Sequence, residues 1–192
     1  MKESRSDKRT TLKMIALVIA LILIGIAIFA FVNKDEENNV STTAVDTVET
    51  TGSSDYYFRD GVLQLQDARI EITDSKVIPV GEKGNEHGDK PVIAFWYKTT
   101  NLSDKEFSAS TPWIASFEAI QDNNPNTVNK LEVGMHPDDR YLDTQFENIK
   151  KGGTAEDAIA YELDDMTTPV VLKATRGMGG ESLGEHTYTI KE

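Results

Sequence analysis

The chain has 192 residues, 39% of them hydrophobic and 27% charged, with no cysteine and a formal net charge of −12. This length accommodates one ordinary domain and an appendage. The absence of cysteine excludes a disulfide scaffold, thiolate zinc sites, cysteine nucleophiles and a cysteine-linked lipid anchor. The acidic balance argues against nucleic-acid binding, which requires clustered lysine and arginine side chains.

Residues 14–32 are the first element in chain order and the strongest signal in the sequence. They contain no charged side chain, and a helix of this length spans about 29 Å, close to the thickness of a bilayer's hydrocarbon core. A cleaved signal peptide is the alternative, but its apolar core is normally shorter and ends in small residues. This segment ends in Phe31 and Val32. We therefore predict an uncleaved transmembrane helix that contacts the lipid bilayer.

The charges on either side of this segment differ in sign. Residues 1–13 carry five basic and two acidic side chains, whereas residues 34–192 carry 15 basic and 30 acidic side chains. Basic flanks remain on the cytoplasmic side of a membrane. We expect a single-pass cell-membrane protein with a cytoplasmic tail over residues 1–13 and an extracellular C-terminal domain.

Residues 33–55 have a different composition from the rest of the chain. Eight of them are serine or threonine, six are acidic and none is aromatic. Such a segment cannot bury enough apolar surface to offset the entropy of ordering it. We predict a disordered acidic stalk between the membrane and the folded domain.

Residues 56–192 alternate apolar and polar side chains with a period of two, and turn-forming residues separate the runs. Only residues 137–149 show helical spacing. Many short strands and little helix predict an all-β fold, an immunoglobulin-like antiparallel β-sandwich. The predicted strands cover residues 62–65, 68–78, 91–100, 111–121, 155–163, 170–174 and 187–191.

Several motifs in this region also carry a resemblance. They are Ala68–Thr73, Lys90–Tyr97 with Asn101–Asp104, Trp113–Asn123, and Lys150–Thr154 leading to Ala160–Asp165. The region resembles a family of domains of unknown function in Gram-positive surface lipoproteins and membrane-anchored proteins. That family is similar to the telokin-like, immunoglobulin-like sandwich of secreted mycobacterial immunoprotective antigens. The resemblance implies a fold and a surface location but no catalytic residues. Family members often carry a lipid-modified cysteine, and here the predicted helix would take its place.

Two motifs that are associated with chemistry have simpler interpretations. Residues 180–184 match the G-x-S-x-G pattern, but a nucleophile elbow requires a following helix and a downstream histidine partner, so a glycine-rich hairpin loop is the better interpretation. Asp122, Asn124 and Asn126 imitate the start of a calcium loop, although the glycine and the bidentate glutamate of such a loop are missing. A weak calcium site in this loop, or at Asp164 and Asp165, is the alternative to a solvated turn.

Aromatic side chains give the remaining candidate site, a platform for a sugar or a peptide. Strand alternation places Phe95 and Tyr97 on one face and Trp96 on the other, so Trp96 is either covered by a loop or exposed to a ligand. We expect no cofactor, no metal site and no catalytic residue. The predicted ligand-binding residues are Trp96, Trp113, Asp122 and Asn124.

The sequence thus predicts a non-catalytic role, in which an extracellular domain binds an envelope or extracellular protein or polymer. Loops on a rigid sandwich are suited to recognition. One alternative is a cell-wall hydrolase that uses an acidic pair such as Asp138 with Asp164, which would need two carboxylates in one cleft. The other is a structural subunit of a membrane complex that associates through residues 14–32.

Overall fold

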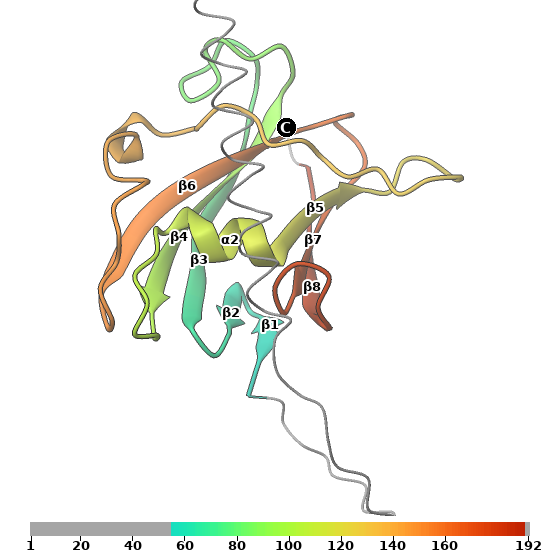
Figure 1. Cartoon of the computed structure of the whole chain (residues 1–192). Helices are drawn as coiled ribbons and strands as arrows, with labels where there is room; N and C mark the ends of the chain where they lie inside the picture. The colour runs from blue at the N-terminus through green and yellow to red at the C-terminus, as the bar shows by residue number, and fades with distance from the viewer. Residues whose placement is uncertain (1–54, 191–192) are drawn as a thin grey trace, which may run out of the picture. The chain divides into compact units, whose positions relative to one another are not determined.

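The computed structural model describes residues 55–190, which form two antiparallel β-sheets (Figure 1). One sheet has five strands in the order β1-β2-β3-β4-β6, and the other has three in the order β5-β7-β8. The predicted all-β architecture of two antiparallel sheets is therefore confirmed. The strands are β1 Tyr57–Arg59, β2 Val62–Gln64, β3 Ala68–Ile78, β4 Val92–Asn101, β5 Phe117–Gln121, β6 Thr154–Glu162, β7 Val170–Thr175 and β8 Ser182–Tyr188. The helical elements are α2 Ser110–Ser116 and the 3₁₀ turn η1 Asp139–Tyr141.

Most predicted strands lie close to their expected positions. β3 coincides with the predicted strand at 68–78, and β2, β4, β6 and β7 each differ from their predictions by one residue at one or both ends. β4 is central, with β3 and β6 on either side. β8 begins at Ser182, five residues before the predicted strand at 187–191.

Two expectations from the sequence are wrong. The predicted strand at 111–121 is the helix α2 followed by β5. Pro112 lies in the first turn of α2, where its missing N–H is tolerated, and Trp113 points into the core while Ile114 is 63% exposed. The predicted helix at 137–149 is only the turn η1, which the Asp138 side chain caps by accepting a hydrogen bond from Arg140 N.

The main core lies on the inner face of the five-stranded sheet and is rich in aromatic side chains. Trp113 is fully buried, stacks on Tyr97 with ring centroids 4.3 Å apart and also contacts Phe95 and Phe117. Its Nε1 donates a hydrogen bond of 2.9 Å to the hydroxyl of Tyr161. Paired aromatic rings with satisfied polar ends give this core both its apolar area and its specific geometry.

The outer face of the same sheet carries a second, smaller cluster of Ile78, Val92, Ala94 and Ala160, against which Trp96 packs. A β-bulge creates this face on β3, because the register with β4 shifts between Ile72, which pairs with Tyr97, and Asp74, which pairs with Trp96. One extra residue in a strand reverses which side chains face outward beyond it. Asp74, Lys76 and Ile78 therefore lie on the same face as Trp96.

The predicted membrane segment lies outside the part of the chain that the structure describes. The cytoplasmic tail 1–13, the transmembrane helix 14–32 and residues 33–54 of the stalk lie outside the described residues. Within residues 55–190, no helix has the length and apolar character needed to cross a bilayer.

Candidate functional site

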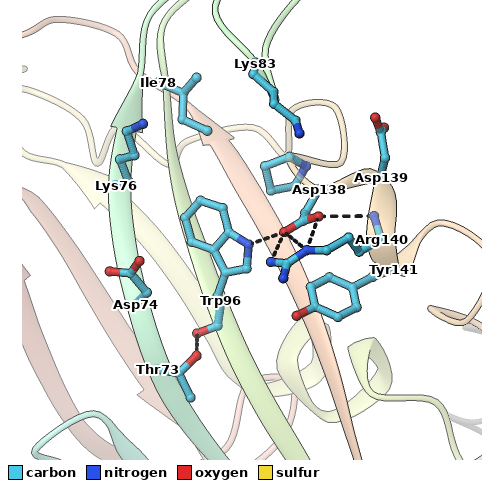
Figure 2. Close-up of a pocket in the computed structure, with 11 residues that line it drawn as sticks. Thr73, Asp74, Lys76, Ile78, Lys83, Trp96, Asp138, Asp139, Arg140 and Tyr141 are labelled. Carbon is cyan, nitrogen blue, oxygen red and sulfur yellow. Dashed lines mark hydrogen bonds and ion pairs between the residues drawn. The ribbon is translucent and has the colours of Figure 1, made fainter.

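A groove on the outer face of the five-stranded sheet is the candidate site (Figure 2). Its volume of about 570 Å³ is in the range of small-molecule sites. β3 and β4 form its floor, the loop between them contributes Lys83, and the η1 segment forms the opposite wall. We call it the Trp96 groove; its lining residues are Thr73, Asp74, Lys76, Ile78, Lys83, Trp96 and Pro137 to Tyr141.

Trp96 is held at the centre of this groove by Asp138. The indole Nε1 donates a hydrogen bond of 2.8 Å to Asp138 Oδ2, and Figure 2 shows the ring between the β3 side chains and the η1 turn. Arg140 grips the same carboxylate, with Nη2 at 2.6 Å from Oδ2 and Nε at 2.9 Å from Oδ1. Hydrogen bonds from Arg140, followed by that from Trp96, hold the pKa of Asp138 well below its usual range despite partial burial.

The wall beyond Asp138 presents a cation and an aromatic ring. The Arg140 side chain is 71% exposed and lies over the Tyr141 ring, 5.2 Å from its centroid. The Tyr141 hydroxyl donates to Glu156 Oε2 at 3.2 Å, and Glu156 also pairs with Lys98 at 3.1 Å. Hydrogen bonding to Lys98 and then Tyr141 lowers the pKa of Glu156. The wall is therefore tied to β4 and β6 by charged groups.

The loop between β3 and β4 closes against the η1 segment. Gly84 has a φ of +93°, and a Cβ at this position would overlap the carbonyl oxygen of Pro137. The same loop is fixed by buried Asn85, whose Nδ2 donates to the carbonyls of Ile78 and Lys90 at 3.2 and 2.8 Å. Glycine is required where a left-handed backbone approaches another chain segment this closely.

His136 connects the groove wall to the main core. Its Nε2 lies 3.0 Å from Asp157 Oδ1, and its Nδ1 accepts a hydrogen bond of 3.2 Å from Asp138 N. Asp157 is 2% exposed and also accepts from the Tyr97 hydroxyl at 3.0 Å. Burial, followed by the nearby Asp157 carboxylate, raises the pKa of Tyr97 far above its usual value. Both polar ends of the imidazole are thus used to position the residue that holds Trp96.

The predicted ligand-binding residues do not come together. Trp96 lines the groove, whereas Trp113 is fully buried in the core and does not line it. The pattern of aromatic residues did not distinguish the core helix from a surface strand. Asp122 and Asn124 are exposed in the loop after β5 and do not line the groove. The Asn124 side chain accepts a hydrogen bond of 2.9 Å from Asn126 N within its own loop.

The acidic residues near that loop are occupied by neighbouring donors. Asn123 Nδ2 donates to Asp164 and Asp165 at 3.1 and 2.9 Å, and Asp165 also accepts from Thr168 N at 2.6 Å. Backbone hydrogen bonds, chiefly from Thr168, lower the pKa of Asp165. In the described part of the chain, no three histidine or acidic side chains are grouped as metal ligands. The calcium alternative therefore stays a prediction without a ligand cluster behind it.

The G-x-S-x-G motif has the interpretation expected from the sequence. Residues 176–181 connect β7 to its antiparallel partner β8, and Ser182 is the first residue of β8. The backbone of Arg176 donates a hydrogen bond of 2.9 Å to Glu181 across the turn. A strand follows this serine, so the strand-to-helix geometry of a nucleophile elbow is absent at this motif.

The groove also contains residues that the sequence did not indicate, namely Lys76, Lys83, Arg140 and Tyr141. The Asp138 side chain, which caps η1, also lines the groove. Nothing in the sequence shows that Asp138 reaches Trp96, because the two residues lie 42 positions apart.

Comparison with known proteins gives the family of this chain. No curated protein shows a significant match. A solved structure from Staphylococcus aureus subsp. aureus NCTC 8325, described as a "putative lipoprotein", matches with a TM-score of 0.58 and 22% identity. The match covers 71% of this chain and 92% of that one, and it shows a similar fold. Residues 43–176 match the domain of unknown function DUF5067, and the chain therefore belongs to the DUF5067 family.

Proposed function

We propose that this protein is a single-pass membrane protein whose extracellular, immunoglobulin-like domain binds a component of the cell envelope in the Trp96 groove, without catalysis. Residues 14–32 would cross the bilayer, residues 1–13 would remain in the cytoplasm and residues 33–55 would form the stalk. The description of the S. aureus structure of similar fold is consistent with a location at the membrane surface. This arrangement would present the groove outside the cell.

The observation that carries the binding proposal is the way in which Trp96 is held in the groove. Its ring lines a groove, and its N–H is satisfied by an ionised aspartate that Arg140 and the η1 turn hold in place. A half-buried tryptophan that is fixed in this way is pre-organised for contact with a ligand, because little side-chain entropy remains to be lost on binding.

A hydrolase that uses Asp138 with Asp164 is less well supported. The lowered pKa of Asp138 keeps this carboxylate ionised at neutral pH, which does not suit a general acid. Asp164 does not line the groove and instead accepts hydrogen bonds from Asn123 and Asn129. The two carboxylates thus serve different surroundings.

A capture experiment tests the binding proposal. The detergent-solubilised full-length chain is immobilised and exposed to solubilised envelope material. We expect retention of a component that is lost with Trp96→Ala and weakened with Trp96→Phe, which keeps a ring but removes the N–H to Asp138. Phe146→Ala is the matched control, because Phe146 is 76% exposed and lies outside the groove. Retention that is equal in all four proteins would contradict the proposal.

The absence of native cysteine allows a direct test of the topology. Ser6→Cys and Ser41→Cys each introduce one thiol, on the two sides of residues 14–32. In intact cells, a membrane-impermeant maleimide should label Ser41→Cys only, and both variants should react after lysis. Labelling of Ser6→Cys in intact cells would contradict the orientation.

A further inference from the structure

We propose that the ligand of the Trp96 groove is a neutral saccharide, with the C–H face of a pyranose ring against the Trp96 indole. This inference rests on the binding role proposed above and adds the chemical class of the ligand. Three observations point to it: the balance of charge in the groove, the unengaged polar groups around the ring, and the half-buried aromatic rings of Trp96 and Tyr141.

The groove is electrically balanced in a strongly acidic domain. Residues 55–190 carry 13 basic and 24 acidic side chains. The groove itself has three of each sign: Lys76, Lys83 and Arg140 against Asp74, Asp138 and Asp139. A polyanionic ligand would be repelled by the field of the acidic domain, and the balanced charges of the groove give a polycation no net local attraction. A neutral ligand needs neither a positive nor a negative excess in the groove.

The polar groups around Trp96 include both donors and acceptors that are not engaged. Within residues 55–190, the ammonium groups of Lys76 and Lys83 form no ion pair or side-chain hydrogen bond, and neither does the Asp139 carboxylate. Arg140 uses Nε and Nη2 on Asp138, which leaves Nη1 free to donate. A saccharide hydroxyl both donates and accepts, so it can use groups of either kind.

The surface beside these groups includes aromatic rings. Trp96 and Tyr141 line the groove and are half-buried, whereas Ile78 and Pro137 line it with little exposed area. The negative face of an aromatic ring attracts the polarised C–H groups of a sugar ring. An extended peptide would instead pair with backbone groups of a free strand edge, but Trp96 lies on β4, which β3 and β6 flank on both sides. The geometry therefore favours a saccharide over a peptide.

The test uses the full-length chain in detergent and envelope material from the cells that produce it. This material is divided into neutral oligosaccharides, which pass an anion-exchange resin, anionic oligosaccharides, which the resin retains, and peptides. Binding of each fraction is followed by tryptophan fluorescence and calorimetry. We expect the neutral fraction to bind, with an affinity that falls about tenfold or more in Trp96→Ala and is unchanged in Phe146→Ala. Trp96→Phe retains a ring and should bind with intermediate affinity. It serves as the test variant if Trp96→Ala fails to fold.

A second variant separates neutral from anionic ligands. The double substitution Lys76→Gln with Lys83→Gln removes two charges but keeps hydrogen-bonding side chains. For a neutral saccharide, affinity should fall modestly, because glutamine donates weaker hydrogen bonds than an ammonium group, and added salt should have little effect on binding by either protein. Lys105→Gln with Lys173→Gln is the control, because these lysines also form no ion pair in the described region and lie outside the groove.

The outcomes distinguish the ligand class from the binding role. Trp96-dependent binding of the anionic or peptide fraction alone would overturn the saccharide proposal and leave the binding role intact. A large, salt-dependent loss in the lysine double variant would also overturn it in favour of an anion. If no fraction bound in a Trp96-dependent manner, both proposals would fail.

Discussion

The two tryptophans of this domain have opposite surroundings. Trp113 is fully buried on the inner side of the five-stranded sheet, where aromatic rings surround it and its N–H meets the hydroxyl of Tyr161. Trp96 lies on the outer side, half-buried, and its N–H meets the carboxylate of Asp138. The core thus satisfies one indole with a neutral partner, and the groove satisfies the other with a charged one.

If Trp96 binds a ligand as proposed above, this difference separates stability from recognition within one sheet. A ring buried on all sides stabilises the fold, whereas a ring fixed at its edge and left open to a groove is available for contact. Asp138, which holds the Trp96 indole, connects to the core through His136 and Asp157. The following predictions test how far the two sides are independent.

The largest effect is expected on the inner side. Trp113→Ala should lower the free energy of unfolding by about 3–5 kcal/mol, because it leaves a cavity among packed rings. Ile114→Ala, its exposed neighbour on α2, should change it by about 0.5 kcal/mol or less. Urea unfolding followed by circular dichroism measures both. A loss below about 1.5 kcal/mol for Trp113→Ala would mean that the inner rings do not form a tightly packed core.

The link between the two sides is expected to be next in magnitude. Tyr97→Phe removes the hydroxyl that donates to buried Asp157 and should destabilise the domain by about 1–3 kcal/mol. Tyr188→Phe provides the comparison, because burial raises the pKa of Tyr188 to about 12 but its hydroxyl has no hydrogen-bond partner within residues 55–190. Equal urea midpoints for the two variants would show that the hydrogen bond from Tyr97 to Asp157 does not contribute measurably to stability.

The closure of the groove can be tested with two glycines in one loop. Gly84→Ala should destabilise the domain by about 1–3 kcal/mol through backbone strain and displacement of Pro137. Gly81 has a similar φ of +84°, and a Cβ added there would meet nothing within 4 Å. Gly81→Ala should therefore lower the free energy of unfolding only through backbone strain, by about 1 kcal/mol. The difference between their unfolding free energies reports the contact with Pro137. Identical losses would place the loop away from that carbonyl.

The smallest effect concerns pH. Because the folded-state pKa of Asp138 is below its unfolded value of about 3.9, its stabilising contribution is present above pH 4 and is lost only as pH falls through the lower, folded-state pKa. The wild-type tryptophan fluorescence should therefore be unchanged down to about pH 4 and should change only at lower pH, whereas Asp138→Asn, which cannot ionise, should not show that low-pH change. Asp139→Asn is the control. A wild-type fluorescence transition centred above pH 4 would show that Asp138 does not hold the indole.

Sequence reasoning recovered the elements whose signal is local. The alternation at Ile70 and Ile72 located β3, and that at Phe95 and Tyr97 located β4. It failed at α2 and its junction with β5, where Trp113 and Phe117 pack into a core that only the tertiary structure creates. In that segment, Pro112 was the available helix signal, and the surrounding aromatic and β-branched residues favoured a strand.

The candidate site was recovered only in its centre. Strand alternation placed Trp96 opposite the core and left two alternatives, a loop cover and an exposed face. The structure combines them, because the η1 segment holds one edge of the ring and the groove remains beside it. The partners of Trp96 come from a distant segment whose arrival depends on Gly84, His136 and buried Asp157, and no local pattern encodes that long-range contact.

The β-bulge in β3 determines which side chains of this strand line the groove. In a strand, odd and even positions point to opposite faces, and the extra residue at Thr73 exchanges the two sets for the rest of β3. If Thr73 instead paired regularly with Trp96, Ser75 and Val77 would face outward, and Asp74 and Lys76 would turn toward the core. A register shift that removes the bulge while keeping Thr73 would thus erase the charged floor of the groove without changing any residue that lines it, whereas deletion of Thr73 would leave Asp74 opposite Trp96. The position of the bulge along β3 therefore specifies the site as much as the identities of the lining residues do.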